Sequence, residues 1–270
     1  MPVLDVRPGL SVAYRRLGAG PVLVCVPGGP GRASSYLDDL GGLTATRTLV
    51  LVDLPGTGDA PAPAEPEGYQ VPDLAAAVQA VVDDLDQESV DVLGHSAGVV
   101  TATAWAAGHP DRLARLVLLS PGGRQLGLGY DDAEAVRASR AGETWYDDAI
   151  RTDDWTPFFY GRWDDRARAH AAREDDQRSE AATDSFGLGD LDPGPLRASL
   201  AALGAPALIV GGSLDPLGTA ICRHWAELLP NAEVVTIPEV AHYPWVDDPQ
   251  AVRETIERFL SRPTPTRARD

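Results

Sequence analysis

The stretch VDVLGHSAGVV, Val90–Val100, places one serine between an apolar run and a run of small residues. Gly94 and Gly98 stand two positions before and two positions after Ser96. The pattern G-x-S-x-G between a strand and a helix is typical of a sharp turn that lifts a serine hydroxyl clear of the backbone. Side chains larger than glycine would collide on both sides of such a turn, and the serine itself takes a strained conformation. The stretch therefore predicts a nucleophilic Ser96 at the head of a helix.

Short β-rich runs alternate with helical patterns on both sides of this turn. Apolar residues recur at helical spacing in residues 73–88, which predicts a helix that covers a sheet. The opening two runs are joined by Pro8-Gly9 and predict an antiparallel hairpin. The alternation as a whole predicts an α/β fold with a mostly parallel central sheet flanked by helices. The runs that predict strands are 3–7, 10–17, 22–26, 48–53, 90–95, 115–120, 207–212 and 233–238.

Residues 121–200 differ in composition from the rest of the chain. They contain no strand-like run, are dense in charge and carry many aromatic side chains. We expect them to form a helical cap inserted into a core made of residues 1–120 and 201–262, and we expect residues 263–270 to be a disordered tail. The aromatic residues of the insertion either bind substrate or fill a small core of its own, and those assigned to substrate are Trp145, Phe158, Phe159 and Trp163.

Composition excludes several classes of function. The formal net charge of −17 repels nucleic-acid phosphates and anionic membrane surfaces, so neither is an expected partner. All 23 basic residues are arginine, which excludes a catalytic lysine. The two cysteines, the absence of a long apolar run and the lack of a signal sequence predict a cytoplasmic protein.

No pattern of side chains predicts a cofactor or a metal site. The segment DLPGTGDA has Gly56 and Gly58 but lacks the third glycine of a dinucleotide site. Histidine and cysteine residues lack metal-ligand spacing. We therefore expect a small-molecule substrate, no cofactor and no metal, and the sequence leaves the oligomeric state open.

A serine hydroxyl becomes a good nucleophile when a base takes its proton. His242 follows the last predicted strand, and Asp215 follows the strand at 207–212. The carboxyl ends of parallel strands meet at one edge of a sheet, so a loop there can bring both side chains to Ser96. We predict that His242 is the general base and that Asp215 fixes its tautomer and stabilises its charged form.

Other histidines and carboxylates are weaker candidates for these roles. His95 lies next to Ser96 in the turn and is expected to point elsewhere. Asp247 and Asp248 follow His242 closely and are expected to cap the final helix. The remaining histidines are expected to be solvated or to cap helices, and they are His109, His170 and His224.

The oxyanion of a tetrahedral intermediate needs two backbone N–H donors. One donor is predicted at Ala97, the residue after the nucleophile, and the other at Gly29 in the loop VCVPGGPG. The glycines of that loop let the backbone approach a substrate closely, although PGGPG also fits a tight turn of purely structural importance.

The order of VPGGPG, DLPGTG, GHSAG, GGSLDP and AHYPW makes the chain resemble the α/β-hydrolase superfamily from about Val3 to Leu260, and especially its proline iminopeptidase-like branch. The resemblance implies a Ser-His-Asp hydrolase with a cap that selects the substrate. Members of that branch begin the oxyanion loop with histidine, where this chain has Pro27. They also hold the substrate amino group with cap carboxylates, for which this chain offers Glu143, Glu174, Asp175 and Asp176.

These features lead to one main functional hypothesis and two alternatives. The main hypothesis is a serine hydrolase that cleaves a small ester, lactone or amide through an acyl-enzyme intermediate. The first alternative is a tailoring hydrolase, cyclase or acyltransferase of secondary metabolism. The second is a ligand-binding protein that uses a hydrolase fold without catalysis.

Overall fold

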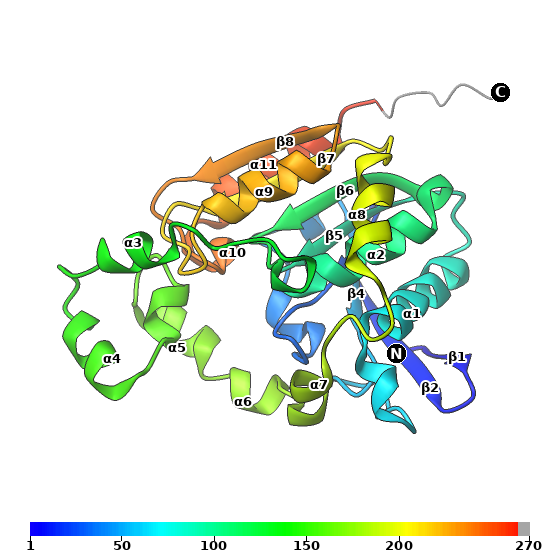
Figure 1. Cartoon of the computed structure of the whole chain (residues 1–270), viewed down its shortest axis with the longest axis horizontal. Coiled ribbons are helices and arrows are strands. Elements are labelled where there is room, and N and C mark those ends of the chain that lie inside the picture. The colour runs from blue at the N-terminus through cyan, green and yellow to red at the C-terminus, as the bar shows by residue number, and fades with distance from the viewer. Residues whose placement is uncertain (264–270) are drawn as a thin grey trace.

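The structure is a computed structural model that describes residues 1–263, with an eight-stranded sheet at its centre (Figure 1). The strands lie in the order β1-β2-β4-β3-β5-β6-β7-β8. The β1–β2 hairpin pairs antiparallel with β4, and the six strands from β4 to β8 pair in parallel. The predicted hairpin and mostly parallel sheet are confirmed. The strands are β1 (Val3–Arg7), β2 (Leu10–Gly18), β3 (Val22–Val26), β4 (Thr48–Asp53), β5 (Val90–His95), β6 (Leu113–Leu119), β7 (Ala207–Gly212) and β8 (Ala232–Ile237).

Helices cover both faces of this sheet. The α-helices are α1 (Val71–Asp84), α2 (Gly98–Gly108), α3 (Ala133–Ala138), α4 (Tyr146–Thr152), α5 (Asp165–Ala171), α6 (Glu174–Gln177), α7 (Glu180–Ser185), α8 (Pro193–Ala201), α9 (Ala220–Leu228), α10 (Pro244–Asp247) and α11 (Pro249–Leu260). Short 3-10 helices complete the loops, among them η1 (Ser34–Leu37), η5 (Arg124–Leu126) and η6 (Thr156–Phe159).

Alternation along the parallel strands divides the core into two apolar layers. In β3, Val24 faces one layer together with α1, α2, α8 and α9, whereas Leu23 faces the other together with η1, α10 and α11. Neighbouring side chains of a strand point to opposite faces, so a strand buried on both sides must be apolar throughout. This explains why the strands read as continuous apolar runs.

The segment between β6 and β7 is helical, and residues 121–200 contain no named strand. Helices α3 to α7 lie beyond the carboxyl ends of the parallel strands (Figure 1), and we call residues 133–185, which carry them, the cap. Helix α8 instead contacts α2 and α9, and Leu196 and Leu200 join the core. The predicted cap boundary at Leu200 stays a prediction, and the packing of α8 favours a boundary before Pro193.

Two further expectations concern the chain as a whole. No helix within residues 1–263 is long and apolar enough to cross a membrane. The predicted disordered tail, 263–270, lies outside the described residues except for Pro263.

Candidate active site

Ser96 stands at a sharp turn between β5 and α2, as its sequence context predicts. Its backbone φ is 53°, in the left-handed region that non-glycine residues rarely occupy. A Cβ on Gly94 would come within 2.8 Å of the Val99 Cα, and one on Gly98 within 2.2 Å of the Pro27 carbonyl oxygen. Glycine is thus required at both positions. The strained turn presents the Ser96 hydroxyl at the head of a helix, where free N–H groups favour negative charge.

The loops after β7 and β8 bring two more side chains to this hydroxyl. The Nε2 atom of His242 lies 2.9 Å from the Ser96 Oγ, and its Nδ1 atom lies 2.9 Å from the Asp215 Oδ2. His242 and Asp215 are each 3% exposed. The second carboxylate oxygen of Asp215 accepts the Leu217 N–H at 2.9 Å, which fixes the orientation of the carboxylate. The arrangement can carry a proton away from the serine and stabilise the resulting imidazolium.

Backbone contacts hold His242 in this position from two sides. Its N–H donates to the Phe159 carbonyl of the cap at 3.1 Å, and its carbonyl accepts the Nε2–H of His95 at 3.0 Å. The ring of Phe159 also meets the imidazole of His242 edge to face. The proposed base is therefore fixed by both the core and the cap.

His95 is a buried link between three parts of the site. The His95 Nε2 faces the His242 carbonyl, which can only accept, so the His95 Nδ1 is the acceptor for the Tyr36 hydroxyl hydrogen at 2.7 Å, and that hydroxyl in turn accepts the Gly28 N–H at 2.7 Å. The remaining proton of the ring then lies on Nε2 and reaches the His242 carbonyl. Burial lowers the pKa of His95 well below its usual value, in agreement with a neutral ring. His95 thus connects the loop of Gly28, the serine turn and the loop of His242.

The two predicted oxyanion donors both face the same cavity. Gly29 and Ala97 line the pocket that contains Ser96 and His242. Within residues 1–263 neither N–H has a hydrogen-bond acceptor, whereas the neighbouring Gly28 N–H is used by Tyr36. A helix N-cap such as Ala97 leaves its N–H without an acceptor inside the helix. Both groups are therefore available to a substrate oxygen.

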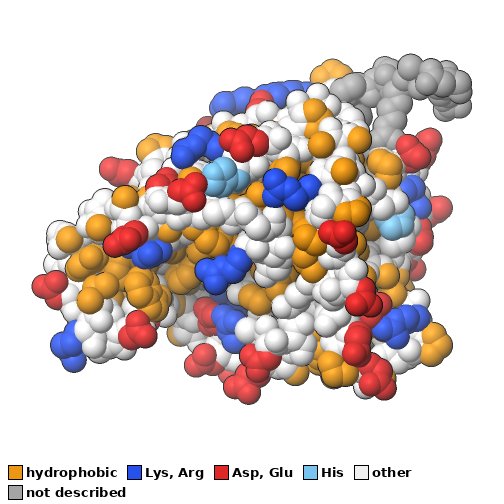
Figure 2. All heavy atoms as spheres, viewed as in Figure 1, with side chains coloured by type: hydrophobic (Ala, Val, Ile, Leu, Met, Phe, Trp, Pro, Cys, Tyr) orange, Lys and Arg blue, Asp and Glu red, His pale blue; other side chains and the backbone are white. Residues whose placement is uncertain are grey.

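The pocket has a volume of about 600 Å³ and lies between the sheet and the cap. Figure 2 shows hydrophobic side chains gathered over the cap, with acidic side chains scattered around them. Of the four predicted substrate-binding aromatics, Phe159 lines the pocket, and the structure adds Trp155, which the sequence reasoning missed. Trp155 is 44% exposed, and no local motif distinguishes it from the other cap aromatics.

The other three predicted substrate-binding residues do not line this pocket. Phe158 is 1% exposed and packs against Trp145 and Trp155. Trp145 also lies against the guanidinium of Arg140. Trp163 packs on Tyr160 and borders a neighbouring hollow. The placement of Trp145, Phe158 and Trp163 corrects the prediction, because short helices without a sheet beneath them need bulky side chains for their own core.

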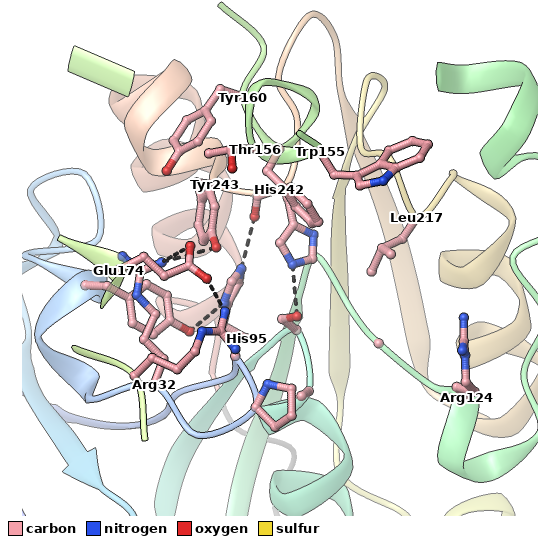
Figure 3. A pocket seen from close by; sticks show the side chains of 18 of the residues that line it. Arg32, His95, Arg124, Trp155, Thr156, Tyr160, Glu174, Leu217, His242 and Tyr243 are labelled. Atoms are coloured by element: carbon pink, nitrogen blue, oxygen red, sulfur yellow. Dashed lines mark hydrogen bonds and ion pairs between the residues drawn. The ribbon is translucent and has the colours of Figure 1, made fainter. Parts of the chain in front are cut away.

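Charged side chains that sequence reasoning did not single out also line the pocket. Arg32 is 1% exposed and stacks over the Tyr36 ring, with its guanidinium carbon 4.5 Å from the ring centroid. It lies 3.6 Å from Glu174 (Figure 3). It also donates to the Gln177 side chain, and Glu174 pairs with Arg178 as well. The residues of this cluster lie far apart in the sequence, so no local sequence pattern reveals it.

Asp247 and Asp248 have different roles, although they are neighbours. Asp248 caps α11 by accepting the Ala251 N–H, as expected. Asp247 does not cap the helix and instead accepts the N–H groups of Ala241 and Gly161, both at 2.8 Å. Burial raises the pKa of Asp247 to about 6, and these N–H donors oppose the shift. Asp247 thereby joins the His242 loop to the cap.

His170 is another departure from the sequence expectation, because it is buried rather than solvated or helix-capping. Its Nδ1 lies 2.8 Å from the Tyr160 hydroxyl, and its Nε2 lies 3.0 Å from the Tyr36 carbonyl. Burial lowers the pKa of His170 to about 4. The histidine ties the cap to the core below the pocket.

Comparison with known proteins agrees with this architecture. Residues 23–255 match the model of the Alpha/beta hydrolase family, and the chain belongs to this family. The chain is 30% identical over 264 residues to the pimeloyl-[acyl-carrier protein] methyl ester esterase of Aeromonas hydrophila, covering 93% of this chain and 100% of that protein.

Solved structures share the fold at low sequence identity. An esterase from Exiguobacterium antarcticum superposes with a TM-score of 0.76 at 18% identity, covering 96% of this chain and 99% of that one. The proline iminopeptidase of Mycobacterium smegmatis gives a TM-score of 0.76 at 18% identity, covering 96% and 97%. The family match and the curated relative indicate a hydrolase, and the solved structures share its fold.

Proposed function

We propose that the chain is a serine esterase that cleaves a small carboxylic ester through an acyl-enzyme formed on Ser96. The observation that carries the proposal is the unbroken contact from the Ser96 Oγ through His242 to Asp215, with both distances 2.9 Å. The pocket that opens on this serine is large enough for a small molecule.

The reaction follows from the positions of these groups. The Ser96 Oγ attacks the ester carbonyl while the His242 Nε2 takes the hydroxyl proton and Asp215 stabilises the imidazolium. The N–H groups of Gly29 and Ala97 hold the oxyanion. When the carbon–oxygen bond of the leaving group breaks, His242 gives the proton to the departing alkoxide. His242 then takes a proton from water, whose oxygen attacks the acyl-enzyme, and returns that proton to the Ser96 oxygen as the bond between this oxygen and the acyl carbon breaks and the acid leaves.

The ion pairs of Glu174 disfavour its use for the free amino group of a peptide. An iminopeptidase needs a carboxylate for the substrate ammonium group, and of the four cap candidates only Glu174 lines the pocket. Glu174 is paired with both Arg32 and Arg178, so its charge is already balanced. An ammonium group would have to displace an arginine, at the cost of a buried guanidinium left without its partner.

A panel of 4-nitrophenyl esters, thioesters, lactones and proline 4-nitroanilide tests the proposal. We expect hydrolysis of short esters that disappears in Ser96→Ala and persists in Ser139→Ala, whose exposed hydroxyl lies outside the pocket. Hydrolysis of the prolyl anilide in preference to the esters contradicts the ester assignment. A folded protein that binds esters without turning them over supports a binding role, and transfer of the acyl group to an added alcohol or amine in preference to water supports a tailoring acyltransferase.

A further inference from the structure

Three guanidinium groups line the pocket, and only two of them have a carboxylate partner. Arg32 and Arg178 share Glu174. The Arg124 side chain is exposed to solvent and makes no ion pair and no hydrogen bond within residues 1–263, and the centroid of the Tyr130 ring lies 5.8 Å from its guanidinium carbon. A positive charge in the pocket is therefore left without a partner in a chain whose net charge is −17.

The segment that carries Arg124 begins against the serine turn. The N–H of Gly122 donates to the Ser96 carbonyl at 3.1 Å, so the chain after β6 runs directly against the serine turn. Arg124 follows two residues later, and two residues span at most about 7 Å. Figure 3 shows Arg124 on the opposite side of His242 from the pair of Arg32 and Glu174. An ester bound at Ser96 could extend one end toward each side.

None of the acidic side chains that the structure describes around Arg124 forms an ion pair with it, although Asp131 and Glu134 line the same adjoining hollow as Arg124. Asp131 lies in the adjoining hollow, 3.3 Å from the His224 Nε2. At the pocket rim, Asp153 accepts the Trp155 indole N–H and Asp154 accepts the Thr156 N–H. Glu134 borders the same hollow as Asp131 and forms no ion pair with Arg124. None of these carboxylates neutralises Arg124 in the structure.

We propose that Arg124 binds a carboxylate of the substrate, so that the preferred substrates are half-esters, molecules with one free carboxylate besides the ester that is cleaved. The inference rests on the proposed esterase function. Guanidinium and carboxylate form charge-assisted hydrogen bonds with matched geometry, which a neutral ester cannot offer. Arg124 is then a specificity-determining residue, and the paired arginines on the other side leave that end of the pocket for a neutral group.

Two pairs of probes test this assignment and locate the carboxylate. In the first pair the carboxylate is on the acyl side, and the mono-4-nitrophenyl ester of glutaric acid is compared with the 4-nitrophenyl ester of glutaric acid monoamide. In the second pair the carboxylate is on the leaving group, and the acetate ester of 4-hydroxybenzoate is compared with the acetate ester of 4-hydroxybenzamide. We expect kcat/KM of the wild type to be higher for the anionic member of one pair than for its neutral partner. Arg124→Gln should reduce this ratio about 10-fold, which corresponds to the lower end of the free energies of hydrogen bonds to charged groups.

Matched variants separate a local contact from general electrostatics. Arg124→Lys keeps the charge and should retain part of the preference, whereas Arg258→Gln removes an exposed arginine of α11 outside the pocket and should leave it unchanged. Added salt should weaken the preference, since the Arg124 side chain is exposed to solvent. The proposal is overturned if Arg124→Gln leaves the anionic-to-neutral ratio unchanged in both pairs, or if Arg258→Gln changes it equally. Continued hydrolysis of the neutral esters in these variants shows that the esterase function itself stands.

Discussion

The floor of the pocket and the cap above it are built by different means. The floor, formed by Gly29, Ser96, Asp215 and His242, lies at strand ends and is fixed by backbone geometry and buried hydrogen bonds. The cap helices α3 to α7 are each only four to seven residues long. Helices this short are unstable alone, so aromatic packing and contacts to the core must hold them. The difference separates the geometry of Ser96, His242 and Asp215, which the strand ends fix, from the upper wall of the pocket, which depends on the packing of the cap.

The largest expected effect comes from the floor. Asp215→Asn keeps the shape of the side chain but cannot stabilise the imidazolium and favours the wrong tautomer of His242. We expect kcat for a 4-nitrophenyl ester to fall about 10⁴-fold with little change in stability. Steady-state kinetics measures this, with Asp248→Asn as the control because that carboxylate only caps α11. A loss below about 10-fold would remove Asp215 from the catalytic group.

A core position of the cap should affect stability rather than chemistry. Phe158 is buried among aromatic rings, so Phe158→Ala should lower the free energy of unfolding by about 3–5 kcal/mol. Trp155 is the matched comparison because it is exposed and lines the pocket. Trp155→Ala should raise KM several-fold and cost under about 1 kcal/mol of stability. Urea unfolding and kinetics on both variants check this, and the reverse pattern would return Phe158 to the substrate site.

The junction of the two regions should show a pH-dependent stability. Asp247 holds the His242 loop against Gly161 of the cap, and its folded pKa of about 6 exceeds the value of 3.8 that it has when exposed. Between these values the folded state binds more protons than the unfolded state, so this group makes stability fall as the pH rises from about 4 to 6. The difference amounts to about 3 kcal/mol.

Asp247→Asn cannot titrate and isolates this contribution. The stability of the wild type minus that of Asp247→Asn, measured by urea unfolding, should decrease by about 3 kcal/mol between pH 3 and pH 7. A difference that is constant over this range would show that Asp247 does not titrate there in the folded protein.

The smallest of these effects tests how the floor is positioned. In His95→Asn the amide can replace Nδ1 toward Tyr36 but cannot reach the His242 carbonyl, whereas His95→Gln can reach that carbonyl. We expect His95→Asn to lower kcat about 10- to 100-fold at nearly constant KM, because the imidazole of His242 is misplaced. His95→Gln should restore most of kcat. Equal losses in both variants, in proportion to their melting temperatures, would make His95 purely structural.

Local sequence patterns were enough for the floor and the sheet. Strands such as β5 are buried on both faces and must be apolar, and the turn at Ser96 requires glycine at Gly94 and Gly98. His242 and Asp215 each follow a strand, and parallel strands end at one edge of the sheet. Their sequence positions therefore placed both side chains near Ser96, where the structure has them.

The cap was harder to predict because its contacts join distant parts of the chain. Phe158 and Phe159 are adjacent and identical in type, yet one fills the cap core and the other faces the pocket. Asp247 and Asp248 likewise differ only in which of them the fold turns inward. The cluster around Arg32 combines residues more than a hundred positions apart. Such choices depend on tertiary packing, which local periodicity does not encode.

Labelling with a fluorophosphonate tests the central claim most directly, because the reagent reacts with a serine that a neighbouring base activates. We expect one phosphonyl group per chain, located on the peptide that contains Ser96, and loss of labelling in Ser96→Ala and His242→Ala. Unlabelled but folded wild-type protein, or a label on another serine that survives Ser96→Ala, would contradict it.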